Sequence, residues 1–486
     1  MARLVKAWPC LASALLFNLA FPPFNLGLLV LAGLVPWLVS LRESTSKEGF
    51  KSGWLFGFLT MLGQLAWMYS FINRWVQNPA LAFIPYLLGC AFVALYFGLL
   101  GWQVSLCWRH KMPWAIPLVW VGMEVLRSYI PGFAFPYSLI ATPLWPYPWM
   151  IQIAYFGSIY LAGAWVVVVN VLLALFLVGG SGWREIRGYF AAVTLGLLVS
   201  WVRYNEATPE TRMAVTVGQP GVDLAFGEPN ANALKLREAV TKFYAQAAIS
   251  RSEMLVLPEG VAGGAGTVPP ETPFTVLESP PVVFGGQRGK DPRYQTAFSY
   301  DGTWQYADKT RLVIFGEFVP LRNQLPFLAT AFQLPNGDLV PGEQVKALKV
   351  GKRTVGPILC FEALFPDIAY KQALNGAEML AVMSVDDWYM GTAAPDQLKA
   401  ASIWRAVETG LPLVRSASLG YSFAVDPRGR LLAEIPTHEP RSFRVELPVG
   451  PAKPFQLFFV FPLAAVSSLA LLPLGLWVMS RRKPRE

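Results

Sequence analysis

The chain has 486 residues, of which 54% are hydrophobic and 15% charged, whereas ordinary soluble domains are about 25% charged. Its net charge of +9 comes from its ends: residues 1–203 have 12 basic and 4 acidic side chains, residues 204–480 have 24 and 26, and the last six residues add +3. The long central part is therefore nearly neutral, which excludes the basic surface that a nucleic-acid partner requires.

Long uncharged stretches of the length needed to cross a bilayer dominate residues 1–203. The segment FPPFN at 21–25 interrupts the first of them, so two short helices joined by a tight turn are expected there. We predict about seven transmembrane helices in an N-terminal membrane domain, 1–203, and one more at 455–480, before a basic tail, 481–486. The predicted spans are 7–41 (two helices), 51–74, 74–109, 113–129, about 150–178, about 187–203 and about 457–479.

The basic residues beside these spans predict their orientation. Thirteen lie on the side of the two termini, whereas the opposite short loops hold only Arg74 and Arg127. Loops rich in Lys and Arg stay in the cytoplasm, so both termini are expected to be cytoplasmic. The domain at 204–450 is then expected outside the cytoplasm.

Residues 204–450 show alternating strand and helix patterns. Helices are predicted at 231–250 and 394–409, and FSYDGTW and VDPRGRLL have the composition of hairpin turns. Strands alternating with helices favour a layered α/β fold. The apolar runs that predict strands lie at 213–221, 253–260, 281–287, 296–302, 355–362, 379–385, 412–420 and 421–429.

Cys360 is the only cysteine of the chain outside a predicted span, and it ends the apolar run GPILC. It could be a packing residue, a metal ligand or a nucleophile. A metal site is disfavoured, because the domain has one histidine, His438, and no second cysteine. No glycine-rich phosphate loop is present either, so neither a metal nor a cofactor is expected. With histidine so scarce, a nucleophilic Cys360 would need a carboxylate as its base.

Three charged residues are candidates for partners of that cysteine. Glu259 ends an apolar run in LVLPEG, where a turn residue is the simpler interpretation, and Lys309 follows Asp308, with which it could form a solvated ion pair. Glu317 is embedded in the apolar segment FGEFVP, so it must be paired or functional. Taken one by one, these residues leave the chemistry open.

The order of the three segments resembles a known pattern. LPEG, then the lysine and FGEFVP, then ILCFE is similar to the nitrilase superfamily with its Glu–Lys–Cys set, and within it to the apolipoprotein N-acyltransferase family. The resemblance implies a four-layer αββα sandwich for 204–450, joined to a polytopic α-helical membrane domain. The segments SVDDWY and RAVETGLPLVRSAS match later parts of the family in outline.

The resemblance also implies roles for individual residues. Glu259 would be the proton acceptor, Lys309 the cation beside the oxyanion, and Cys360 the nucleophile. In supporting positions, Glu317 would hold the lysine and Glu362 matches the acid that follows the cysteine. Phe361 stands where the family often has tyrosine.

The function implied is the transfer of an acyl chain from a phospholipid, through a thioester, to the N-terminal amine of diacylated apolipoproteins. Such an enzyme would be a monomer in the inner membrane of a bacterium, in contact with membrane lipid, with its catalytic domain on the periplasmic side. A membrane-anchored amidase that transfers the acyl group to water is the alternative, since it would use the same three residues. A non-catalytic receptor domain is a weaker alternative.

Overall fold

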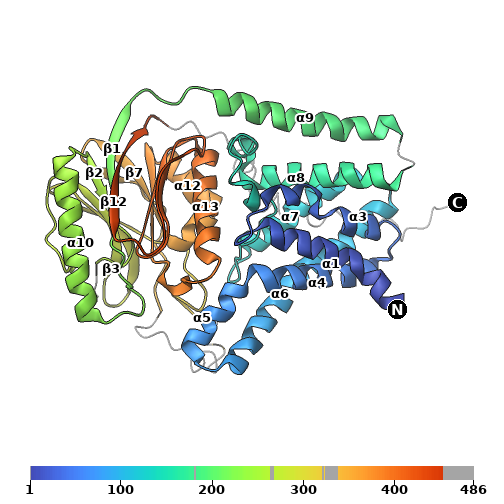
Figure 1. Ribbon diagram of the computed structural model, residues 1–486, viewed down its shortest axis with the longest axis horizontal. Coiled ribbons are helices and arrows are strands. Elements are labelled where there is room, and N and C mark those ends of the chain that lie inside the picture. Colours follow the sequence, from blue (N-terminus) through green and yellow to red (C-terminus); the bar gives the residue numbers. More distant parts are fainter. Residues whose placement is uncertain are drawn as a thin grey trace. The chain divides into compact units, whose positions relative to one another are not determined.

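The structure is a computed structural model, and it describes residues 2–179, 182–262, 268–319, 322, 324 and 338–451. These residues form two compact units (Figure 1). Of the described residues, the first unit comprises 2–205 and Thr392–Gln397, and the second comprises Glu206–Gly391 and 398–451. The predicted C-terminal helix at 455–480 and the basic tail at 481–486 lie outside the described residues.

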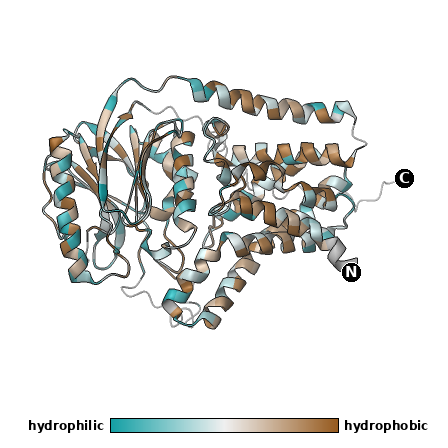
Figure 2. Cartoon of the chain, viewed as in Figure 1, coloured by the Kyte–Doolittle hydropathy of each residue, from teal (hydrophilic) through white to brown (hydrophobic). Residues whose placement is uncertain are grey.

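The first unit is helical throughout, as the sequence predicts. Figure 2 shows that hydrophobic residues predominate along its helices. Short 3-10 turns join some of them at Gly27–Leu29, Pro113–Ala115 and Thr142–Leu144. The described helices are α1 (Ala2–Ala20), α2 (Val30–Gly33), α3 (Val35–Leu41), α4 (Ser46–Gln64), α5 (Ala66–Val76), α6 (Pro79–Arg109), α7 (Ile116–Tyr129), α8 (Ala154–Val178) and α9 (Trp183–Asn205).

Two of the described helices, α6 and α8, are each long and apolar enough to cross a membrane. The segment 51–74, expected as one straight span, is instead the bent pair α4 and α5, which meet at an angle of 54° and would count as a third crossing. The number of about seven crossings in 1–203 stays a prediction.

Glycines allow α4 to pack closely on α6. A β-carbon on Gly53 would lie 2.1 Å from the Phe97 carbonyl oxygen, and one on Gly49 would lie 2.6 Å from that of Gly101. Small residues at such positions let two helix backbones approach, which is the usual packing of helices in lipid.

The second unit is built on two sheets of six strands each. The strand order is β12-β1-β2-β3-β4-β5 in the first sheet and β11-β10-β9-β8-β7-β6 in the second. The strands are β1 (Arg212–Gln219), β2 (Met254–Val256), β3 (Val282–Arg288), β4 (Tyr294–Tyr300), β5 (Trp304–Asp308), β6 (Leu348–Val350), β7 (Arg353–Leu359), β8 (Met379–Ser384), β9 (Leu413–Ala417), β10 (Ser422–Val425), β11 (Leu431–Ile435) and β12 (Arg441–Pro448).

The two sheets pack face to face on a core that both supply. Val215, Val217 and Val283 of the first sheet belong to the same buried cluster as Leu359 and Met379 of the second. The helix α10 (Pro229–Ile249) covers the outer face of the first sheet, and Figure 1 shows α12 (Pro366–Leu374) and α13 (Ala394–Thr409) beyond the second. This arrangement confirms the predicted αββα sandwich.

The spacing of its apolar residues explains why α10 lies on the sheet. Leu236, Val240, Phe243 and Ala247 recur at helical intervals and are all buried. They pack in one cluster with strand residues such as Phe284. The helices expected at 231–250 and 394–409 are thus confirmed, and each of the eight apolar runs contains a strand. The short β6 and the final β12 were not predicted as separate strands.

Candidate active site

Glu259 lies just beyond the carboxyl end of β2. The extended chain after this strand continues along β3, where Leu257 N donates to Val283 O (2.9 Å) and Gly285 N donates to Pro258 O (3.1 Å). Only a glycine fits at 285, because a β-carbon there would lie 2.8 Å from Cα of Glu259. The Glu259 side chain is 4% exposed, so its carboxylate is held in the interior.

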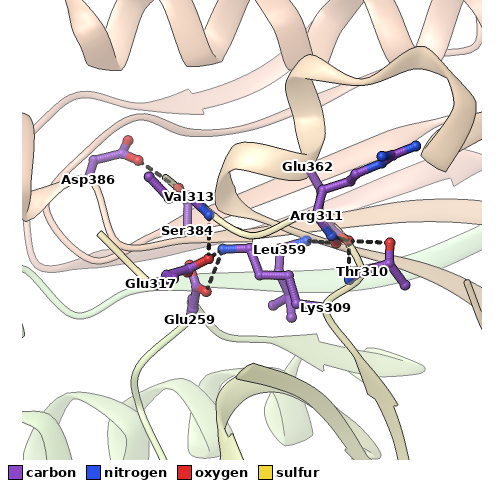
Figure 3. Close-up of polar contacts among 10 residues, drawn as sticks. All are labelled: Glu259, Lys309, Thr310, Arg311, Val313, Glu317, Leu359, Glu362, Ser384 and Asp386. Carbon is purple, nitrogen blue, oxygen red and sulfur yellow. Dashed lines mark hydrogen bonds and ion pairs between the residues drawn. The ribbon is translucent and has the colours of Figure 1, made fainter. Parts of the chain in front are cut away.

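Lys309 is the first residue after β5, at the same edge of the sheet as Glu259. The two strands run in the same direction, since β2 is parallel to β3 and two antiparallel pairings lead from β3 to β5. Lys309 is 1% exposed. Its Nζ lies 2.6 Å from Oε1 of Glu317 and 3.6 Å from Oε1 of Glu259 (Figure 3). Glu317 is fixed in turn by the N–H of Val313, which donates to its Oε2 at 2.9 Å.

Cys360 follows β7 and opens the 3-10 turn Cys360–Leu364 (η4). Its φ is +46°, a backbone conformation that is uncommon for a residue with a side chain. Such strain at a strand end occurs where a side chain is held in a required direction. The sulfur is close enough to Glu259, Lys309 and Ser384 for each of them to influence its ionisation.

The structure therefore brings Glu259, Lys309, Glu317 and Cys360 into one buried cluster. Glu362 ties the lysine segment to the cysteine turn: its Oε1 accepts from Thr310 N (2.8 Å), Thr310 Oγ1 (2.9 Å) and Arg311 N (3.2 Å), and its Oε2 accepts from Leu359 N (3.1 Å). Figure 3 shows this carboxylate between the two segments. Phe361 packs its ring edge-to-face on Phe365 at 5.2 Å between centroids.

The charged groups in this cluster shift one another's pKa values. Burial raises the pKa of Glu259 to about 7, against the lowering effect of Lys309. Burial alone lowers the pKa of Lys309, but the facing Glu259 and Glu317 outweigh it, so the pKa is raised and the ammonium stays charged. Burial and then Glu259 raise the pKa of the Cys360 thiol to about 12. At neutral pH the resting site holds a thiol, an ammonium and a carboxyl group that can take up a proton.

A second layer of polar residues was not predicted from the sequence. Ser384 Oγ donates to Oδ1 of Asp386 at 2.7 Å, and Asp386 pairs with Arg415 at 2.8 Å in a buried ion pair. Ser384 ends β8 and Arg415 lies in β9, so neighbouring parallel strands bring the three together. The segments SVDDWY and RAVETGLPLVRSAS contain them, but nothing in their spacing marks a contact. Within the described ranges, no group of three or more potential ligands could hold a metal ion.

Comparison with known sequences finds a family match for each of two parts of the chain. Residues 13–172 match the family described as Apolipoprotein N-acyltransferase N-terminal domain, and residues 287–442 match Carbon-nitrogen hydrolase. The apolipoprotein N-acyltransferase of Geobacter metallireducens is 25% identical, with 94% of this chain and 93% of the relative covered. Over nearly its whole length, the chain is similar to this apolipoprotein N-acyltransferase.

Other apolipoprotein N-acyltransferases are similar to the chain over comparable lengths. The apolipoprotein N-acyltransferase of Pseudomonas aeruginosa is 26% identical over 98% of this chain and 97% of its own. That of Allorhizobium ampelinum is 28% identical over 88% and 87%. The carbon-nitrogen hydrolase match contains Lys309, Glu317 and Cys360, whereas Glu259 precedes it.

Two solved structures are each similar to about half of the chain. A carbon-nitrogen hydrolase from Helicobacter pylori is 15% identical, covering 56% of this chain and 95% of its own, with a TM-score of 0.36. An amidase from Nesterenkonia is 21% identical, covering 50% and 92%, with a TM-score of 0.34.

Proposed function

We propose that this protein transfers an acyl chain from a phospholipid to the N-terminal amine of diacylglyceryl-cysteine in apolipoproteins. The observation that carries the proposal is the combination, on one chain, of the acyltransferase N-terminal domain with a buried Glu–Lys–Cys cluster in a carbon-nitrogen hydrolase domain. Relatives named apolipoprotein N-acyltransferase match both parts together.

In the first step the sulfur of Cys360 attacks the ester carbonyl of the phospholipid. The thiol proton passes to Glu259 as the carbon–sulfur bond forms, because a thiol with a pKa of about 12 does not ionise in advance at neutral pH. Lys309 and the N–H of Phe361 stabilise the oxyanion, at about 3 kcal/mol for a well-placed donor. The proton on Glu259 then goes to the departing lysophospholipid, leaving an acyl thioester.

In the second step the free amine of the diacylated peptide attacks the thioester. Glu259 takes a proton from the nitrogen, the carbon–sulfur bond breaks, and Cys360 recovers its proton as the amide is released. A thioester suits this exchange since it reacts readily with amines. Glu317 holds the ammonium of Lys309 in place through both steps, as its 2.6 Å contact indicates.

Both substrates are anchored in lipid, and the apolar helices associate this protein with a membrane. Anchoring enzyme and substrates in one bilayer raises their effective concentration. The placement we propose is the inner membrane of a bacterium, with the catalytic unit on the periplasmic side, cytoplasmic termini and a monomeric enzyme.

The test is an acyl-transfer assay on the purified full chain. Phospholipid with deuterated acyl chains and a synthetic diacylated lipopeptide are incubated with the protein, and the peptide is analysed by mass spectrometry. We expect one deuterated acyl chain on the peptide amine, none with Cys360→Ala, and none when the amine is acetylated beforehand. Release of deuterated fatty acid without acylated peptide would instead identify a hydrolase.

A further inference from the structure

Asp387 is a buried carboxylate that the proposed chemistry does not use. It opens the 3-10 turn Asp387–Tyr389 (η5), directly after Asp386, and is 1% exposed. Its neighbour Asp386 has a buried cationic partner, Arg415. A carboxylate in the interior is costly unless hydrogen bonds stabilise it, so the donors around Asp387 indicate what it holds.

Those donors come from two other loops. Asp387 Oδ2 accepts from Leu224 N at 2.6 Å, while Oδ1 accepts from Ser418 Oγ and from Leu419 N, the latter at 3.2 Å. A further bond joins the same two loops, from Gly221 N to Ser418 O at 3.1 Å. Asp387 thus ties the chain around Leu224 to the end of β9 through its two carboxyl oxygens.

The loop that Asp387 fixes lies beside Gly260, the residue that follows the proposed base. Gly260, the residue after Glu259, has a φ of +79°, and a β-carbon there would lie 3.0 Å from Val385 Cγ2 and 3.6 Å from Leu224 Cδ1. Two apolar side chains therefore lie close to the backbone at Gly260, next to Glu259.

We propose that Asp387 is a positioning residue that keeps Leu224 against Gly260, the residue after Glu259, and so directs the acyl-enzyme to an amine in place of water. The inference rests on the proposed acyltransferase function. Attack of an amine on the thioester gives an amide and the free thiol, whereas attack of water gives a fatty acid and the free thiol. Both reactions hand a proton from the nucleophile to Glu259, hence access of water to that carboxylate decides how much acyl chain is hydrolysed.

Two substitutions test the hydrogen bonds of Asp387 and the apolar side chain of Leu224 separately. Asp387→Asn leaves one acceptor oxygen where there were two, so either the N–H of Leu224 or that of Leu419 loses its acceptor. Leu224→Ala removes most of the apolar side chain but keeps the backbone N–H that donates to Asp387. The matched control is Asp426→Asn, since Asp426 is also buried and accepts backbone bonds from Arg428 N (2.8 Å) and Arg430 N (2.9 Å) in the β10–β11 turn.

Two quantities are measured on the full chain in detergent micelles. The first is amide hydrogen exchange in a peptide covering 222–227, and the second is the ratio of fatty acid to N-acylated lipopeptide. For Asp387→Asn we expect exchange about tenfold faster, from the loss of one hydrogen bond. We expect the product ratio to rise about fivefold in both Asp387→Asn and Leu224→Ala, and neither quantity to change in Asp426→Asn.

A wild-type product ratio in both Asp387→Asn and Leu224→Ala would overturn the inference. If Asp387→Asn fails to fold, the ratio for Leu224→Ala decides alone. A wild-type protein that releases fatty acid but forms no amide would reject the proposed function instead. In that case, unchanged amide hydrogen exchange at 222–227 in Asp387→Asn would separately reject the claim that Asp387 holds this loop in place.

Discussion

Lys309 donates a 2.6 Å hydrogen bond to Oε1 of Glu317 in the interior of the second unit, which we call the catalytic unit. The nearest oxygen of Glu259 is farther from the same ammonium, at 3.6 Å. The two carboxylates are therefore not equivalent: Glu317 is the fixed partner of the lysine, while Glu259 is left able to exchange a proton. This asymmetry supports separate roles for the two acids and leads to the first predictions.

The rate of acyl-enzyme formation should rise with pH through about 7. Glu259 accepts a proton only when it is ionised, and burial raises its pKa to about 7, so the base is mostly protonated and inactive below that pH. Rapid-quench measurement of thioester formation, at pH values spread roughly evenly from about 5 to about 9, checks this prediction. A rate that levels off already near the ordinary glutamate value would contradict it. Glu259→Gln should lower the rate by about 10²–10⁴-fold.

Glu317→Gln should move that pH profile towards lower pH. The negative charge of Glu317 helps to raise the pKa of Glu259, and Lys309 lowers it, so removing the first charge leaves the lysine to act alone. The maximal rate should fall as well, because Lys309 loses its closest partner. Glu446→Gln is the control, since Glu446 pairs with Arg444 at 3.0 Å on the surface and should leave the profile unchanged. A profile that stays in place in Glu317→Gln would argue against the coupling.

Cys360 should resist alkylation by iodoacetamide at pH 7. Burial raises the pKa of its thiol to about 12, so the reactive thiolate is scarce before substrate binds. We expect modification about a hundredfold slower than that of an exposed cysteine. The comparison is Leu234→Cys in a Cys360→Ala background, because Leu234 is 60% exposed on α10. Peptide mapping by mass spectrometry gives both rates, and equal rates would show that the thiolate is already formed.

Glu362→Gln should destabilise the catalytic unit and slow acylation together. The Glu362 carboxylate accepts hydrogen bonds from backbone N–H groups, and the amide nitrogen of glutamine would face one of these donors instead. We expect the free energy of unfolding to fall by about 1–3 kcal/mol. Thr310 directly follows Lys309, so the ammonium should shift as well. Glu253→Gln is a suitable control, as Glu253 accepts from Ala214 N at 3.2 Å but is half exposed. Denaturant unfolding and thioester formation are the measurements, and a stable, fully active Glu362→Gln would be the contrary result.

Much of the fold follows from local patterns in the sequence. The apolar spacing of α10 and the eight apolar runs give the right element types, because each pattern reflects the face that an element buries. The bend at Leu65 was missed because neither a proline nor a charged residue marks it between Lys51 and Arg74. The strand β12 was missed because its pairing partner, β1, lies more than two hundred residues earlier, and its burial is visible only once they meet.

The site was less visible in the sequence than the fold. Glu259, Lys309 and Cys360 stand at the ends of three strands, and only their order, through the resemblance, connected them. The roles assigned to these residues remain predictions. Ser384, Asp386 and Arg415 had no such signal, since an arginine inside an apolar strand shows its partner only when β8 and β9 lie side by side.

The most direct measurement follows the acyl group through the enzyme. Full-length protein is pulsed with phospholipid carrying a labelled acyl chain, digested, and mapped by mass spectrometry, and a parallel sample is chased with diacylated lipopeptide before digestion. We predict a hydroxylamine-labile label on the peptide containing Cys360, and its quantitative transfer to the lipopeptide amine during the chase. A label that is absent from Cys360, or that leaves only as free fatty acid in the presence of the lipopeptide, would contradict the proposed acyl transfer.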